Sequence, residues 1–315
     1  MHVNGLALIV GVLLFAGAPF GVTPQVRAET PDTLKVVVTI PVLKDWAYRV
    51  GGSHVQVVSL ISGLESEHTY SPKPSDLVAV RKARVLLEVG LGLEVWVSSL
   101  IKSAGNHDLL VVTTSSGIAL MRGSGNHPTT EGARGGGRHR GNPHVWLDPE
   151  NAKTMIRHIT EAFIKVDSEH AADYRKNQAE YLRELDNLQD ELVGRLREVP
   201  DRRIVVHHPA WPYFARRFGL KIEGQIVSQA GAEPSAHHLQ ALIQQIRKHR
   251  IRVIVSEPQL NQKIPRVLAH DTNARVVVLT PLPGGLPGTD TYLDMLRYDV
   301  WQLAEALEES KSMEG

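Results

Sequence analysis

The sequence predicts an α/β protein of two small lobes, each built on a parallel sheet, with one long helix joining them. Short β-branched runs alternate with helical stretches along almost the whole chain, which is the pattern of parallel α/β units. This alternation is interrupted once, by an extended helical periodicity over residues 168–198 that ends before Pro200. A chain of 315 residues is long enough to give two such lobes separate cores.

Each predicted strand is a short run rich in Val, Ile and Leu. The strands are Leu34–Ile40, Val55–Ile61, Val85–Val89 and Leu109–Thr113 in the first half, and Arg203–His207, Lys221–Val227, Arg252–Ser256 and Arg275–Leu279 in the second. The helices between them cover residues 42–50, 75–83, 93–103, 149–166, 211–218, 235–249, 263–271 and 290–309. The long helix carries one apolar stripe made of Tyr174, Tyr181, Leu185, Leu188, Leu192 and Leu196. Its length suits a connection between two lobes.

Residues 1–28 resemble an export signal. Leu6–Val22 is apolar and rich in small residues, and Val26-Arg27-Ala28 resembles a small-residue cleavage site. An anchoring transmembrane helix is the alternative, but Gly17, Pro19 and Gly21 interrupt the apolar run before it reaches spanning length. We therefore expect a signal peptide over 1–28, an N-terminal lobe over 29–166, a linking helix over 167–199 and a C-terminal lobe over 200–315.

One segment of the N-terminal lobe has a different composition. Residues 121–141 are rich in Gly and Arg without any apolar period, which predicts a mobile loop. His127 and His139 lie within it, and a weak metal-collecting role is the alternative to two solvated side chains.

Charge and cysteine content narrow the function classes. The formal net charge of +1 gives no electrostatic footprint for nucleic acid or an anionic membrane. Because the chain has no cysteine, it cannot carry a lipid on an N-terminal cysteine, and any metal site must use nitrogen and oxygen ligands. We expect a monomeric, soluble protein outside the cytoplasm.

Three histidines occupy comparable and well-fixed positions. His68 follows a predicted strand, in a segment stiffened by Pro72 and Pro74, with Ser75 placed to cap the next helix. His144 precedes a helix that Pro149 begins and Asp148 can cap, and His208 follows the first strand of the second lobe. Ligands of such sheets bind beyond the carboxyl ends of the strands. A metal cleft between the lobes can unite the three rings, and neutral imidazoles suit Zn²⁺ as well as Mn²⁺, Ni²⁺ or Cu²⁺.

We do not expect the other histidines outside residues 121–141 to bind the metal. His207 is next to His208 on an extended segment and should point to the opposite face. His237 and His238 are expected at a solvated helix end. Surface or core positions are expected for His54, His107, His158, His170, His249 and His270.

The sequence resembles the periplasmic metal-binding receptors of zinc and manganese ABC importers, the cluster A-I solute-binding proteins. The motifs that carry the resemblance cover nearly all of the chain after residue 28. They are His68-x-Tyr70-x-Pro72-x-Pro74-Ser75-Asp76, Asn142-Pro143-His144-Val145-Trp146-Leu147-Asp148-Pro149, His208-Pro209-Ala210-Trp211-Pro212-Tyr213-Phe214, Glu257-Pro258-Gln259 and Tyr292-Leu293-Asp294-Met295. The resemblance implies that His68, His144 and His208 are metal ligands and that the loaded protein docks on a membrane permease. A histidine in the third position accompanies zinc receptors of this family and a glutamate accompanies manganese receptors, so Zn²⁺ is the expected cargo and Mn²⁺ the alternative.

The fourth ligand departs from the family pattern. Members often place an aspartate after the last strand, where this chain has Thr280, and a threonine hydroxyl is a poor zinc ligand. Three candidates follow: Glu257 at another strand end of the second lobe, Glu67 beside the first histidine, or water. We include Glu257 in the predicted site, with a structural carboxylate that orients a ligand as its alternative role, whereas a glutamate placed like Glu67 more often faces solvent.

An enzyme is the competing class. Three histidines with an open position also describe a catalytic zinc that activates water, as in a zinc-dependent hydrolase. The sequence has no His-Glu-x-x-His motif, no serine nucleophile motif and no phosphate-binding glycine loop. We therefore expect a receptor that binds and delivers its ion, not an enzyme.

Overall fold

The computed structural model describes residues 33–121, 141–228 and 231–312. The expected signal peptide and nearly all of the Gly/Arg-rich segment, with His127 and His139, lie outside the described residues. Within the described ranges, none of the helices combines the length and apolar character that crossing a bilayer requires.

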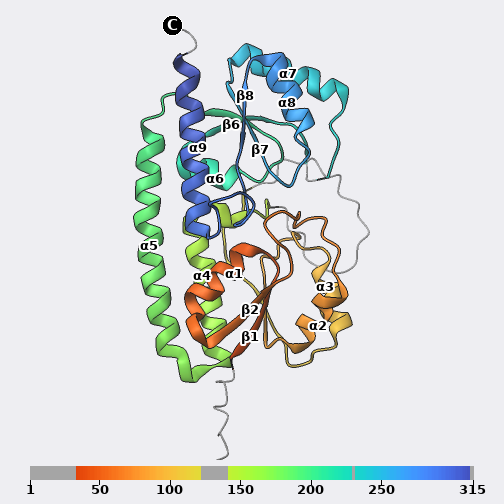
Figure 1. Ribbon diagram of the computed structural model, residues 1–315, viewed down its shortest axis with the longest axis vertical. Helices are drawn as coiled ribbons and strands as arrows, with labels where there is room; N and C mark the ends of the chain where they lie inside the picture. Colours follow the sequence, from red (N-terminus) through yellow and green to blue (C-terminus); the bar gives the residue numbers. More distant parts are fainter. Residues whose placement is uncertain (1–32, 122–140, 229–230, 313–315) are drawn as a thin grey trace, which may run out of the picture. The chain divides into compact units, whose positions relative to one another are not determined.

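The first lobe is a four-stranded parallel sheet in the order β2-β1-β3-β4, drawn from red to yellow in Figure 1. Its strands are β1 (Leu34–Val38), β2 (Val55–Ser59), β3 (Val85–Glu88) and β4 (Leu110–Thr113). Its helices are α1 (Pro41–Gly51), α2 (Pro74–Lys82), α3 (Val97–Ala104) and α4 (Pro149–Val166). The β1 and β3 strands are buried along almost their whole length, as expected for strands covered on both faces.

The second lobe repeats this topology, with the strand order β6-β5-β7-β8. Its strands are β5 (Arg203–Val206), β6 (Lys221–Gln225), β7 (Val253–Ser256) and β8 (Arg275–Val278). Its helices are α6 (Pro212–Phe218), α7 (Ala236–His249), α8 (Lys263–Thr272) and α9 (Tyr292–Ser312). Both halves therefore have the predicted α/β architecture, and in each sheet the first strand in the chain, β1 or β5, is one of the two interior strands.

The long helix α5 (Ala171–Arg197) connects the two lobes. It packs against α1 and α4 of the first lobe and against α6 and α9 of the second, and Figure 1 shows it running beside α4 and α9. Each member of the predicted apolar stripe is buried: Tyr174, Tyr181, Leu185, Leu188, Leu192 and Leu196. A short 3₁₀ turn, η3 (Ser168–His170), replaces the expected first residues of this helix. The domain boundaries themselves stay predictions.

Several helices begin within three residues of the expected start or one turn later, and for two of them a side chain explains the difference. The helix predicted from Leu93 begins at Val97, because the Glu94 carboxylate accepts the backbone N–H groups of Val89 and Gly90 and holds the preceding segment as a turn. The helix predicted from Ser75 begins at Pro74, and Asp76 provides the stabilising carboxylate by accepting the backbone N–H of Lys73. A side chain that folds back onto the backbone N-terminal to it leaves no periodic signal in a sequence.

Asp148 joins the two lobes as well as capping a helix. Its carboxylate accepts the Glu150 N–H at the start of α4, which confirms the predicted cap, and it is fully buried. The same carboxylate accepts from Arg216 Nη2 at 2.9 Å and from Arg217 Nε at 2.7 Å, both on α6 of the second lobe. The segment 142–148 is therefore held against the second lobe by charge-assisted hydrogen bonds.

We expect Asp148→Ala to lower the free energy of unfolding by about 2–4 kcal/mol, because it removes a cap and two charge-assisted bonds at a buried position. Asp148→Ser is the matched control, since serine keeps the cap and loses only the arginine contacts; it should recover about 1 kcal/mol of the loss. Urea unfolding followed by circular dichroism measures both. Equal stability of all three proteins would show that these contacts contribute nothing.

Candidate metal centre

Four side chains from both lobes converge on one point. One ligand atom from each of Glu67, His68, His144 and His208 lies within 4.8 Å of every other. Among the described residues, these four side chains are the group that could hold a metal ion. Glu67 and His68 come from the segment after β2, His144 precedes the 3₁₀ turn η2 (Val145–Leu147) and α4, and His208 follows β5. The three histidines predicted from the sequence are therefore brought together.

Four of the distances within this group are close to the spacing of ligands around a small cation. The Nε2 atom of His144 lies 3.0 Å from Nε2 of His68 and 3.3 Å from Nε2 of His208. Oε1 of Glu67 lies 3.5 Å from Nε2 of His144 and 3.7 Å from Nε2 of His68. Tetrahedral zinc with bonds of about 2.0–2.1 Å separates its ligand atoms by about 3.4 Å. Only a small adjustment is needed for these atoms to coordinate one ion.

Glu67 is buried, contrary to the expectation that it faces solvent. Its side chain is only 4% exposed, and its Oε1 atom has no hydrogen-bond partner among the described residues. An ionised carboxylate oxygen without a donor is costly to bury unless a cation compensates it. The orphaned oxygen is the one that faces the histidines, so it fits a metal ion.

His144 is oriented by Asn142. The amide Oδ1 of Asn142 accepts the backbone N–H of His144 at 3.0 Å and lies 2.9 Å from its Nδ1. Because an amide oxygen can only accept, Nδ1 of His144 carries the proton and Nε2 presents its lone pair to the cluster. The amide Nδ2 of Asn142 donates to the Pro209 carbonyl, beside His208.

His208 is oriented by Glu257, which the structure does not bring into the ligand group. The Glu257 carboxylate lies at the opposite side of the ring, 2.7–2.9 Å from Nδ1 of His208, and it also accepts from the indole N–H of Trp211. This is the arrangement of a carboxylate that holds a metal-binding imidazole, in which Nδ1 donates and Nε2 faces the ion.

Thr280 does not belong to the four converging side chains. Its hydroxyl donates to the Leu282 carbonyl at 2.7 Å and accepts the Leu282 N–H, and its own N–H donates to Asp299. The hydroxyl is thus engaged within its turn.

His207 lies apart from the ligand group, with its Nδ1 3.0 Å from the Ser256 hydroxyl. His238 lies at the exposed start of α7, where its Nε2 is 2.9 Å from the Gln225 carbonyl. Neither contributes to the four converging atoms.

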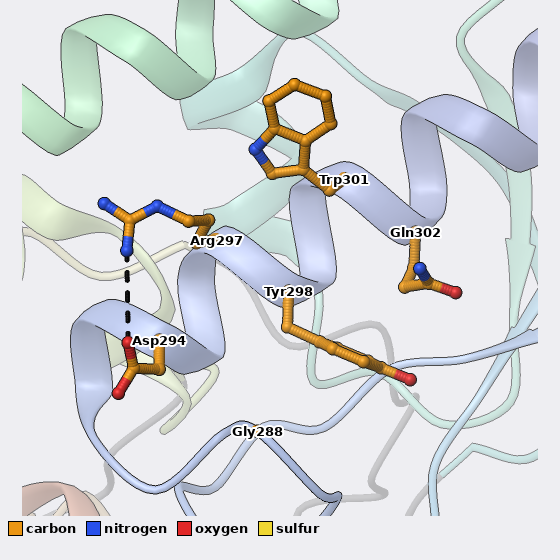
Figure 2. A pocket seen from close by; sticks show the side chains of 6 residues that line it. All are labelled: Gly288, Asp294, Arg297, Tyr298, Trp301 and Gln302. Atoms are coloured by element: carbon orange, nitrogen blue, oxygen red, sulfur yellow. Dashed lines mark ion pairs between the residues drawn. The ribbon is translucent and has the colours of Figure 1, made fainter.

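A separate hollow lies along α9 (Figure 2). It has a volume of 390 Å³ and is lined by Gly288, Asp294, Arg297, Tyr298, Trp301 and Gln302. Its one carboxylate, Asp294, pairs with Arg297 at 3.9 Å, and it contains no histidine. This hollow therefore offers no alternative metal site.

The three rings differ in protonation. Burial, reinforced by the charge of His144, lowers the pKa of His68 to about 4, and burial also lowers the pKa of His144 well below its usual value. Both rings are neutral at pH 7 and offer lone pairs. Burial opposes a charge on His208 too, but the negative charge and hydrogen bond of Glu257 outweigh it and raise the pKa of His208.

Sequence reasoning missed the roles of Asn142 and Trp96 and left Glu67 open. The signal for Asn142 is its place two residues before His144 in a proline-stiffened segment, where a short amide can reach back to the ring. The signal for Glu67 is only its position beside His68. No local pattern identifies Trp96, whose indole N–H donates to the Glu67 carbonyl from a distant loop.

Fold and site together define a two-lobed α/β protein with a histidine-rich centre, able to hold a metal ion, where the two lobes meet. Residues 36–306 match the family model described as "ZnuA: Zinc-uptake complex component A periplasmic". The chain belongs to this ZnuA family of periplasmic zinc-uptake components.

Known proteins agree with this assignment. The chain is 30% identical over 270 residues to the high-affinity zinc uptake system protein ZnuA of Brucella abortus (strain 2308), covering 76% of this chain and 81% of the relative. A crystal structure of a zinc-bound ZnuA deletion mutant superposes with a TM-score of 0.77 at 29% identity, over 87% of this chain and 98% of the other. A Mn-bound periplasmic metal-binding protein from Candidatus Liberibacter asiaticus gives a TM-score of 0.72 at 25% identity, covering 86% of this chain and 98% of that one.

We expect zinc binding to release protons in a pH-dependent way. A protonated His208, whose pKa is raised, must lose its Nε2 proton to bind the ion, so about one proton should leave per zinc below that pKa and none well above it. Affinity should then fall about tenfold per pH unit on acidification. A second proton should appear only as the pH approaches the pKa of His68, about 4.

Isothermal titration in buffers of different ionisation enthalpy measures this release. Glu257→Gln is the control, because loss of the carboxylate should lower the pKa of His208 and move the release to lower pH. Binding without proton release at every pH would contradict the assignment of His208.

Proposed function

We propose that the protein is an extracytoplasmic receptor that binds Zn²⁺ between its lobes through Glu67, His68, His144 and His208 and delivers it to an ABC-type membrane permease. The observation that carries this proposal is the convergence of three Nε2 atoms and one unpartnered carboxylate oxygen within 4.8 Å. The zinc named in the family description and the zinc-bound relative support the same cargo.

The donor set favours zinc over manganese. Three neutral imidazole nitrogens and one carboxylate oxygen suit tetrahedral Zn²⁺, whereas Mn²⁺ prefers more oxygen ligands and a higher coordination number. The Mn-bound relative keeps manganese as the second candidate cargo. Selectivity is therefore measured with both ions.

The surroundings compensate the charge of the ion. Glu67 supplies one negative charge directly, and Glu257 supplies a second through the Nδ1–H of His208. These two carboxylates balance a divalent cation without any further anion. Glu257 thus has a defined part in the proposed mechanism, as the group that fixes the tautomer of His208 and increases its basicity.

The ion enters and leaves on the side of His68. The His68 side chain is 23% exposed, whereas the side chains of His144, His208 and Glu67 are at most 4% exposed. The loop that carries Glu67 and His68 is therefore the part of the site that a permease can reach. Hand-off then requires this loop to withdraw its two ligands from the pair formed by His144 and His208.

A zinc hydrolase is the alternative from another class. Hydrolytic zinc needs an open coordination position for water and a nearby base. Four protein ligands fill a tetrahedral shell, and the Glu257 carboxylate on the other side of His208 is engaged by His208 and Trp211. The geometry thus favours binding without turnover. Export through residues 1–28 and a monomeric state belong to this proposal.

We expect Glu67→Gln to weaken zinc binding more than Glu257→Gln. Loss of an anionic ligand should lower the affinity by more than about 100-fold, whereas loss of the carboxylate that orients a ligand should cost about 10- to 100-fold. Competition with a chromophoric chelator measures both affinities. The reverse order would make Glu257 the ligand and remove Glu67 from the site.

We also expect zinc to stabilise the folded protein. At a free concentration 100 times its dissociation constant, zinc should add about 2.7 kcal/mol and raise Tm by roughly 5–10 °C. His144→Ala is the control and should abolish the shift. Scanning calorimetry on chelator-stripped protein, with zinc or manganese added, tests the proposal. If zinc does not shift Tm, the proposal is wrong. If manganese shifts Tm more than zinc does, manganese is the cargo. If the protein hydrolyses esters and His144→Ala loses that activity, the protein is an enzyme.

A further inference from the structure

The loop that carries two of the proposed ligands is held by a tryptophan from another part of the lobe. The indole Nε1–H of Trp96 donates to the backbone carbonyl of Glu67 at 3.0 Å, in a buried position. This bond joins residues 29 positions apart in the sequence. The Glu67 carbonyl, in the peptide bond to His68, is therefore held by a side chain from outside the loop.

A second contact fixes the other side of His68. The ring of Tyr70 packs edge to face on Trp96, with ring centroids 5.1 Å apart. The Tyr70 hydroxyl donates to Asp76 at 2.7 Å, and Asp76 lies at the start of α2. Trp96 thus contacts the chain on both sides of His68, at the preceding residue and two residues after it.

The segment that presents Trp96 is itself unusually constrained. Gly90, Leu91 and Gly92 all have left-handed backbone angles, with φ values of 81°, 60° and 80°, and this conformation is unfavourable for Leu91. The Glu94 carboxylate, buried in the same segment, accepts from Val89 and Gly90 N–H groups and from the Thr39 hydroxyl at the end of β1. Strained backbone persists where surrounding contacts enforce it, and it concentrates at functional sites.

We propose that Trp96 is a positioning residue for the metal centre, which acts by holding the Glu67–His68 loop in the conformation that directs both side chains at His144 and His208. The inference rests on the proposed function, because it assigns a role only if Glu67 and His68 bind the ion. Trp96 is not one of the proposed ligands. It acts on the site indirectly, through the Glu67 carbonyl and the ring of Tyr70.

Trp96→Phe is the informative variant, because phenylalanine keeps an aromatic ring against Tyr70 and removes the N–H donor. Zinc affinity should fall about 10- to 100-fold, as for other groups that orient a ligand. The intense visible bands of tetrahedral Co²⁺, used as a probe ion, should weaken per bound ion because the Glu67 and His68 ligands are less well placed.

Trp46→Phe is the matched control. Trp46 on α1 is fully buried, and its indole N–H has no hydrogen-bond partner among the described residues. The same change of side chain therefore costs packing at Trp46 without loosening the metal loop. Its thermal stability should fall, whereas zinc affinity and the Co²⁺ spectrum should match those of the parent protein. Equal losses of affinity in both variants would mean that Trp96 matters only for stability, and the inference would be wrong.

A second comparison tests whether Trp96 acts through this loop. In a protein that already carries Glu67→Gln and His68→Ala, Trp96→Phe should leave the remaining, weaker zinc affinity unchanged, because the two side chains it positions are gone. A further loss in that background would place the action of Trp96 elsewhere. If Glu67→Gln with His68→Ala keeps full affinity, the ligand set itself fails. If that pair loses affinity but Trp96→Phe does not, only the positioning role is overturned.

Discussion

A buried carboxylate oxygen that meets no hydrogen-bond donor, together with three imidazole nitrogens facing it, imposes the main constraint on this molecule. Such a carboxylate oxygen is unfavourable to bury without a cation, because it gives up water and gains no proton donor in return. The rest of the structure must therefore hold Glu67 and the three rings close together against that cost. The closely fixed neighbours of the site, Asn142, Glu257 and Trp96, are the means by which it does so.

The fold meets this constraint by repeating one topology twice. In both sheets the first strand lies second in the order and the ligand-bearing segments leave from carboxyl ends, so each lobe brings its loops to the edge that faces the other lobe. Polar contacts cross the boundary, between the buried Asp148 carboxylate and the two partly exposed α6 arginines, and between the buried Trp146 indole and the Pro281 carbonyl. The long helix α5 packs on both halves.

Much of this fold follows from the sequence, and the group of converging side chains follows in part. The strands and the buried stripe of α5 were predictable because hydrophobic periodicity reflects burial directly. The three histidines were predictable because each sits in a stiff segment at a strand or helix end. The choice between Glu67 and Glu257 was not predictable, because both follow strands and only the geometry shows which ring nitrogen each carboxylate approaches. Long-range contacts such as that of Trp96 with Glu67 depend on tertiary packing and leave no local pattern.

The residues that flank 122–140 are hydrogen-bonded to each other. Asn142 donates its N–H to the Met121 carbonyl, and the Tyr213 hydroxyl accepts from Met121 and donates to the Asn142 carbonyl, so Met121 and Asn142 both contact one tyrosine. Asn142 lies two positions before His144, so the backbone that leads into the metal centre is anchored to α6 of the second lobe as well as to its own lobe.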